Sequence, residues 1–161
     1  MKKVFLFLIT SFLFVLDRLS KLLAVASLSE GESRPVWLGV FHLTRVNNTG
    51  AAFGMLKQNT GLLTLISIVC VVGITGILVK DFSKKSPSGR ARVSKSFSLR
   101  NLALAMIAAG AAGNLYDRIR YGYVIDFLDF RVWPVFNIAD SSICIGIFLM
   151  IVSLYKIRNT A

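Results

Sequence analysis

Long apolar segments alternate with short polar segments along this chain. Four apolar runs approach twenty residues in length, at about 4–26, 61–79, 99–117 and 138–156. A helix of roughly 20 apolar residues crosses the hydrocarbon core of a bilayer, so the pattern predicts four transmembrane helices. Hydrophobic residues occupy 55% of the 161 positions and charged residues only 17%, a balance unlike that of soluble domains. We therefore expect an all-α membrane protein with a single integral membrane domain, residues 1–161.

The positive charge is distributed unevenly between the two sides of these runs. The net charge is +11, and most Lys and Arg residues precede the first run, occupy 80–100, or follow the fourth run. Excess Lys and Arg mark cytoplasmic segments, so we expect both termini and the 80–98 loop to be cytoplasmic. The 27–60 and 118–137 loops then lie outside. This distribution favours contact with anionic lipid and argues against nucleic-acid binding.

Residues 1–26 admit a second interpretation, as a cleavable signal peptide. Lys2 and Lys3, an apolar run and Ala24-Val25-Ala26 are typical of one. Asp17, Arg18 and Lys21, however, interrupt the sequence before that site. We favour a retained first helix, which also keeps the four-span topology consistent.

The first outer loop has the composition of a strand pair. Residues 36–46 are rich in β-branched and aromatic side chains and are bounded by Pro35 and Asn47-Asn48, which predicts a small extracytoplasmic hairpin or cradle on the membrane surface. The segment 48–54 follows, Asn-Thr-Gly-Ala-Ala-Phe-Gly. Gly50 and Gly54 permit close approach of another chain.

Two carboxylates, Asp126 and Asp140, lie near the outer ends of the third and fourth runs. A carboxylate near hydrocarbon is costly and is therefore a functional candidate. If 124–130 is extended, Asp126 and Asp129 face opposite ways, so only one can serve a site. Asn137 is placed to cap the fourth helix. Asp140 then lies in the first turn, where the helix dipole favours its ionised form.

Further polar residues fall on shared helix faces. Asp17 and Lys21 are four apart and can pair, and Asn114 and Asp117 are three apart. Arg118 adjoins Asp117 and can orient it or another carboxylate.

The sequence offers little for metal binding. His42 is the only histidine, and Cys70 and Cys144 both fall within predicted spans. These residues do not form a zinc ligand set. We therefore expect no metal and no cofactor.

Two carboxylates that converge can hydrolyse a peptide bond without a metal or a cofactor. One keeps a proton and polarises the carbonyl while the other takes a proton from water. A transporter or proton-relay protein using intramembrane acids is the main alternative, and a structural membrane subunit is a third. The acids cluster toward one face, and the inner half of the bundle lacks ionisable residues to continue a route.

Five ordered blocks of this sequence resemble the bacterial lipoprotein signal peptidases (signal peptidase II). The blocks are Asp17-Arg-Leu-Ser-Lys21, Asn48-Thr-Gly-Ala-Ala-Phe-Gly54, Gly113-Asn-Leu-Tyr-Asp-Arg118, Val124-Ile-Asp-Phe127 and Phe136-Asn-Ile-Ala-Asp140. Length and topology also match. One departure is Ala109-Gly110, where the family often has Gly-Gly, and it concerns helix packing.

The resemblance implies an aspartic endopeptidase of the bacterial cytoplasmic membrane. It would cleave the signal peptide from diacylglyceryl-modified prolipoproteins before the lipidated cysteine, near the outer face. Its partners would be these substrates and membrane lipids, with no obligate protein partner. Implied roles fall into three groups: a catalytic pair, residues that hold substrate and dyad, and more structural polar residues. These are, in turn, Asp126 and Asp140; Asn48, Asn114, Arg118 and Asn137, with Phe53 in a flap or cradle over the site; and Asp17 and Asp117. From the residues themselves, we expect Gly50 to give space for the substrate and Lys21 to be a structural partner of Asp17.

Overall fold

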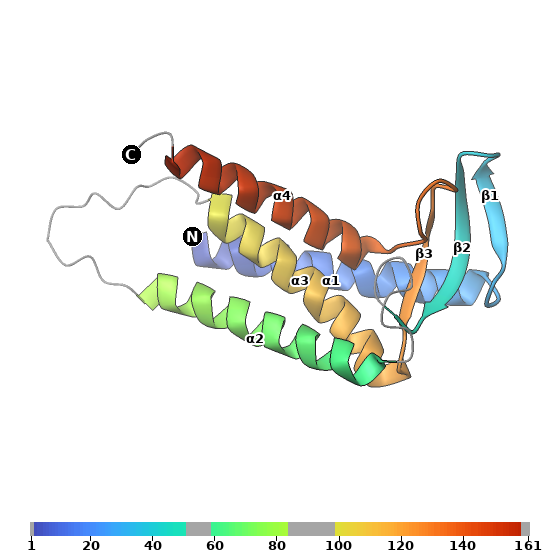
Figure 1. Ribbon diagram of the computed structural model, residues 1–161, viewed down its shortest axis with the longest axis horizontal. Helices are drawn as coiled ribbons and strands as arrows, with labels where there is room; N and C mark the ends of the chain where they lie inside the picture. The colour runs from blue at the N-terminus through green and yellow to red at the C-terminus, as the bar shows by residue number, and fades with distance from the viewer. Residues whose placement is uncertain (1, 51–58, 84–98, 159–161) are drawn as a thin grey trace, which may run out of the picture.

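The computed structural model describes residues 2–50, 59–83 and 99–158, in which four long helices carry a small sheet at one end (Figure 1). The elements in chain order are α1 (Lys2–Ser27), β1 (Ser33–Trp37), β2 (Phe41–Asn48), α2 (Thr60–Ser83), α3 (Leu99–Tyr121), β3 (Val124–Asp129) and α4 (Ile138–Arg158). Each predicted apolar run is therefore a helix, extended by a few residues at one or both ends. The class is mostly helical with a three-stranded antiparallel sheet.

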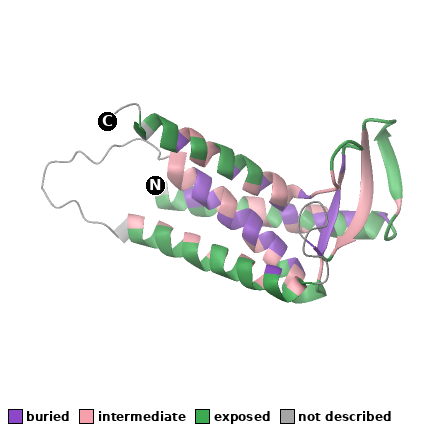
Figure 2. Cartoon of the chain, viewed as in Figure 1, coloured by how far each residue is buried: buried purple, intermediate pink, exposed green. Residues whose placement is uncertain are grey.

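Two of these helices have the length and composition needed to cross a membrane. They are α2, over Thr60–Asp81, and α4, over Ile138–Lys156. The surface of α2 is mostly exposed (Figure 2) and includes large apolar side chains such as Leu65, Val69 and Val72. An apolar surface of this extent is typical of contact with lipid or another protein.

The helix α3 packs against the other three helices, and its contact with α4 is the most extensive. Small residues on α3 and α4 allow these two helices to approach each other closely. A Cβ atom added to Gly110 would lie 2.7 Å from Ile143 Cγ1, and one added to Gly146 would lie 2.9 Å from the carbonyl oxygen of Ala103. Real Cβ atoms do not come this close, so glycine is required at both positions for this separation of the backbones.

The sheet joins the outer loop to the segment between α3 and α4. Its order is β1-β2-β3, with both pairings antiparallel. The β1–β2 pair confirms a hairpin here, although its strands extend beyond the predicted 36–46 and include Pro35 and Asn47. Pairing of β2 with β3 sets Val46 opposite Asp126 and Asn48 opposite Val124. Phe53 lies outside the described residues, as does most of the 80–98 loop.

Candidate active site

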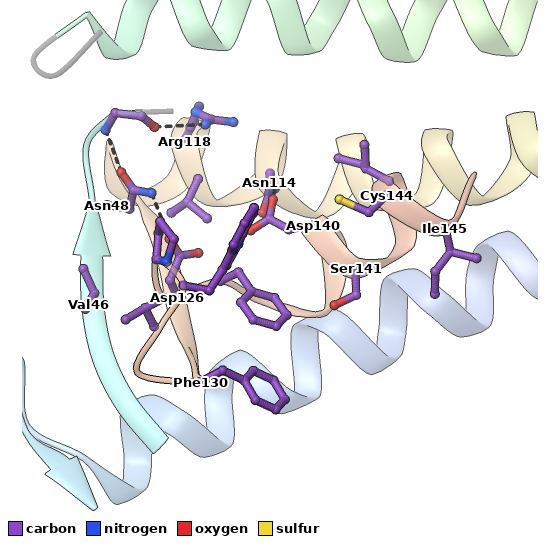
Figure 3. Close-up of a pocket in the computed structure, with 17 residues that line it drawn as sticks. Val46, Asn48, Asn114, Arg118, Asp126, Phe130, Asp140, Ser141, Cys144 and Ile145 are labelled. Atoms are coloured by element: carbon purple, nitrogen blue, oxygen red, sulfur yellow. Dashed lines mark hydrogen bonds between the residues drawn. The ribbon is translucent and has the colours of Figure 1, made fainter. Parts of the chain in front are cut away.

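Asp126 is buried on β3, with 2% of its surface exposed. One of its oxygens accepts a hydrogen bond from Asn48 Nδ2 at 2.8 Å (Figure 3). The other accepts one from Asn137 Nδ2 at 2.7 Å. Asp129 instead accepts hydrogen bonds from Thr44 Oγ1 and Arg131. The predicted opposite facing of these two aspartates is confirmed, because side chains alternate along an extended strand.

Asp140 lies in the first turn of α4, and Asn137 caps that helix as predicted. The backbone N–H of Asp140 donates to Asn137 Oδ1 at 2.9 Å, and the backbone N–H of Asn137 donates to Asp140 Oδ2 at 3.3 Å. This reciprocal pair satisfies two of the free N–H groups at the helix end. The other oxygen of Asp140 accepts a bond of 2.7 Å from Asn114 Nδ2 on α3.

Asn137 brings the two carboxylates together. Its side chain donates to Asp126 while its backbone donates to Asp140. Within the described residues, the hydrogen bonds of both carboxylates come from amide groups and not from each other. Both line a cavity of about 1000 Å³.

The electrostatics of the cavity favour a proton on Asp126. Burial, together with the nearby negative charge of Asp140, raises the pKa of Asp126 to about 7, although hydrogen bonds from Asn48 and Asn137 act in the opposite direction. Two neighbouring carboxylates that share one proton are thus compatible with neutral pH.

The cavity also contains several of the other predicted residues. Asn48, Gly50, Asn114 and Arg118 line it. Arg118 donates to the carbonyl oxygen of Gly50 at 3.4 Å and to Ser67 Oγ at 3.3 Å. Among the described residues, Arg118 makes no hydrogen bond to a carboxylate, because its guanidinium points toward α2 and the end of β2. Its charge nevertheless interacts with those of Asp140 and Asp126.

The apolar walls of the cavity were not identified from the sequence. They come from the segment before α4 and from the first turns of that helix, and include Phe130, Trp133, Pro134, Val135, Phe136, Ile143 and Ile145. The concentration of large apolar residues in 130–136, outside any predicted span, was the available indication.

A buried charged cluster lies beside the cavity, between α1 and α3. The predicted pair is confirmed, with Lys21 Nζ 2.9 Å from Asp17 Oδ2, and the same nitrogen lies 2.8 Å from Asp117 Oδ2. Arg18 also pairs with Asp117. The sequence did not identify Arg18, since nothing local indicates a partner 99 positions away.

Comparisons with known proteins identify one family for this chain. Residues 9–156 match the family described as signal peptidase (SPase) II. The lipoprotein signal peptidase of Halothermothrix orenii is 41% identical over 150 residues, which are 93% of this chain and 94% of that protein. That of Caldanaerobacter subterraneus subsp. tengcongensis is 46% identical over 143 residues, 88% and 90% of the two chains.

A solved structure is similar over nearly the same length. It is a bacterial membrane enzyme determined by the in meso method at 2.3 Å resolution, with a TM-score of 0.77 and 31% identity. The match covers 94% of this chain and 87% of that one. Sequence and structure together show that the chain belongs to the signal peptidase II family.

Proposed function

We propose that this protein is an aspartic endopeptidase that removes the signal peptide from diacylglyceryl-modified prolipoproteins by cleaving before the lipidated cysteine. The substrate class is supported by relatives named lipoprotein signal peptidase. The chemistry is supported chiefly by one observation: Asp126 and Asp140 line one cavity and are both bound by Asn137.

In this proposal the two carboxylates have different roles. Asp140, at the N-terminus of α4, is ionised and takes a proton from a water molecule as that water attacks the scissile carbonyl carbon. Asp126 is protonated and donates to the carbonyl oxygen. The tetrahedral intermediate then returns its hydroxyl proton to Asp126 while the proton on Asp140 passes to the leaving nitrogen. The C–N bond breaks, and the two aspartates return to their starting states, Asp126 protonated and Asp140 ionised.

The cavity walls suit a lipidated substrate. Phe130, Trp133 and Phe136 line it on one side, and Ile143 and Ile145 come from α4. Apolar walls with a few convergent polar groups are typical of ligand pockets. A substrate anchored by its own signal helix and acyl chains would enter laterally from the bilayer.

We further propose a single membrane domain, 1–161, with four spans, both termini cytoplasmic and the dyad near the outer face. The helices α1 and α3 carry charged residues that lower their apolar content. Those at positions 17, 21 and 117 are buried against other helices, with at most 1% exposed. Charges hidden in this way do not face lipid, so these helices too are compatible with crossing a bilayer.

Purified protein incubated with a lipidated prolipoprotein tests the proposal. We expect cleavage by the native enzyme and none by Asp126→Asn or Asp140→Asn, with little activity on unlipidated precursor and no loss on adding a chelator. Asp129→Asn is the matched control, because Asp129 lies on the same strand but binds Thr44 and Arg131. Activity in both dyad variants would refute the assignment.

A further inference from the structure

Lys21 is a fully buried ammonium group next to the proposed active site, with 0% of its surface exposed. Its Nζ contacts the carboxylates of Asp17 and Asp117 and also donates a hydrogen bond of 2.9 Å to Asn114 Oδ1. An ammonium has three donors and no acceptor. All three contacts therefore require an oxygen facing Lys21.

The contact with Lys21 sets the orientation of the Asn114 side chain. A carboxamide has an oxygen that accepts and a nitrogen that donates. With its oxygen toward Lys21, Asn114 directs Nδ2 at Asp140 Oδ1, 2.7 Å away. The flipped carboxamide would place N–H groups against the ammonium and an oxygen against the Asp140 carboxylate, so both contacts would become repulsive.

Asn137 is oriented in a similar way, but by the backbone. The N–H of Asp140 can only donate, and it donates to Asn137 Oδ1. The Nδ2 group of Asn137 consequently faces Asp126 Oδ1 and also donates to Asn114 Oδ1 at 3.1 Å. The Asn114 oxygen thus receives donors from both Lys21 and Asn137, and an N–H group faces each carboxylate of the dyad.

The charge of Lys21 is balanced within the cluster. Asp17 and Asp117 are the two acids, and Lys21 and Arg18 are the two bases in contact with them. A neutral cluster exerts a weaker field on the dyad than a lone ammonium would. The charge of Lys21 still acts on both dyad carboxylates, and its contact with Asn114 adds a second influence that depends on geometry.

We propose that Lys21 is a positioning residue for hydrolysis, which fixes the Asn114 carboxamide so that its N–H group supports the Asp140 carboxylate. This inference rests on the proposed function and assigns to Lys21 a role beyond pairing two helices. Lys21 does not touch the reacting atoms; it acts through Asn114.

Two substitutions of similar length separate the donor from the charge. Lys21→Gln and Lys21→Met both remove the charge, but only glutamine can donate to Asn114 Oδ1. We expect Lys21→Met to lower kcat by roughly 10- to 100-fold, the size expected for one hydrogen bond to a charged group. KM should stay within about twofold, and Lys21→Gln should keep kcat roughly tenfold above that of Lys21→Met.

A double-mutant cycle with Asn114→Leu tests whether the effect passes through Asn114. In the Asn114→Leu background, Lys21→Met should change the remaining kcat by less than about twofold. Thr10→Val is the control: Thr10 lies on the same helix and contacts the carbonyl oxygen of Ala105 on α3, outside the cluster. It should leave kcat unchanged.

Several outcomes would overturn the inference. Equal losses in Lys21→Gln and Lys21→Met, or multiplicative losses in the cycle, would show that Lys21 does not act through Asn114. If neither these variants nor the charge-balanced Lys21→Met/Asp17→Asn gives folded protein by thermal unfolding, Lys21 serves the fold alone. The dyad assignment itself is tested separately: cleavage by both Asp126→Asn and Asp140→Asn would show that it is wrong.

Discussion

The substitution Asp126→Asn is expected to change stability in opposite directions at low and high pH. Burial, reinforced by the charge of Asp140, raises the pKa of Asp126 from 3.8 to about 7 in the folded protein. Between these values the folded protein retains a proton that the unfolded chain has lost. The free energy of unfolding therefore falls as pH rises through this window and stays low above it.

The size of the effect follows from the contacts of this carboxyl. Each pKa unit corresponds to about 1.4 kcal/mol, so the penalty above pH 7 is about 4 kcal/mol, which the neutral amide avoids. The amide has a single oxygen, whereas Asn48 and Asn137 both donate to Asp126. Loss of one such bond costs about 1–3 kcal/mol. The variant should be more stable than the native protein by about 1–3 kcal/mol at pH 8, and less stable near pH 4.

Thermal unfolding of the purified protein in detergent micelles measures this difference. A change of 1 kcal/mol corresponds to about 2–4 °C in Tm for a chain of this size, so we expect Asp126→Asn to have the higher Tm at pH 8 and the lower Tm near pH 4. A Tm difference of the same sign and size at both pH values would refute the reasoning.

The control Asp129→Asn should show no such reversal. Burial by itself would raise the pKa of Asp129, but hydrogen bonds from Thr44 and Arg131 outweigh burial, so the pKa is lowered. Its stabilising contribution is therefore present above the ordinary pKa of 3.8 and is lost as pH falls through the lower folded value. Asp129→Asn should consequently reduce Tm at pH 8, and by less at pH 4.

Three further outcomes are expected. Initial rates between pH 5 and 9 should give a kcat/KM that declines above about pH 7, because Asp126 then loses the proton it donates; a constant value to pH 9 would contradict this role. Gly113→Ala should lower stability by about 1–3 kcal/mol in thermal unfolding, since the new Cβ would lie 2.5 Å from Asp17 Oδ2. Gly73→Ala, whose Cβ meets nothing within 4 Å, should leave stability unchanged. Equal losses of stability in the two variants would contradict the packing argument. Gly50→Val should reduce cleavage of lipidated substrate because Gly50 lines the cavity, and undiminished cleavage would exclude a need for space there.

Local patterns in the sequence were sufficient for the elements and for several site features. The four apolar runs predicted the helices because a run of apolar residues can satisfy its backbone only by internal hydrogen bonds in a membrane. The cap at Asn137 and the opposite facing of Asp126 and Asp129 also follow from spacing alone. Helix ends and strand alternation are decided within a few residues, so they can be read without the fold.

The residues that surround the dyad depend on tertiary packing. Asn48 meets Asp126 only because β2 pairs with β3, and Lys21 reaches Asn114 only because α1 lies against α3. The sequence predicted that Lys21 pairs with its helical neighbour Asp17. It contained no indication of the hydrogen bond to Asn114, which lies 93 positions further along the chain. Such contacts depend on the separation and rotation of whole helices. Those are set by the sum of many packing contacts, including the close approach at Gly110, and by no local pattern.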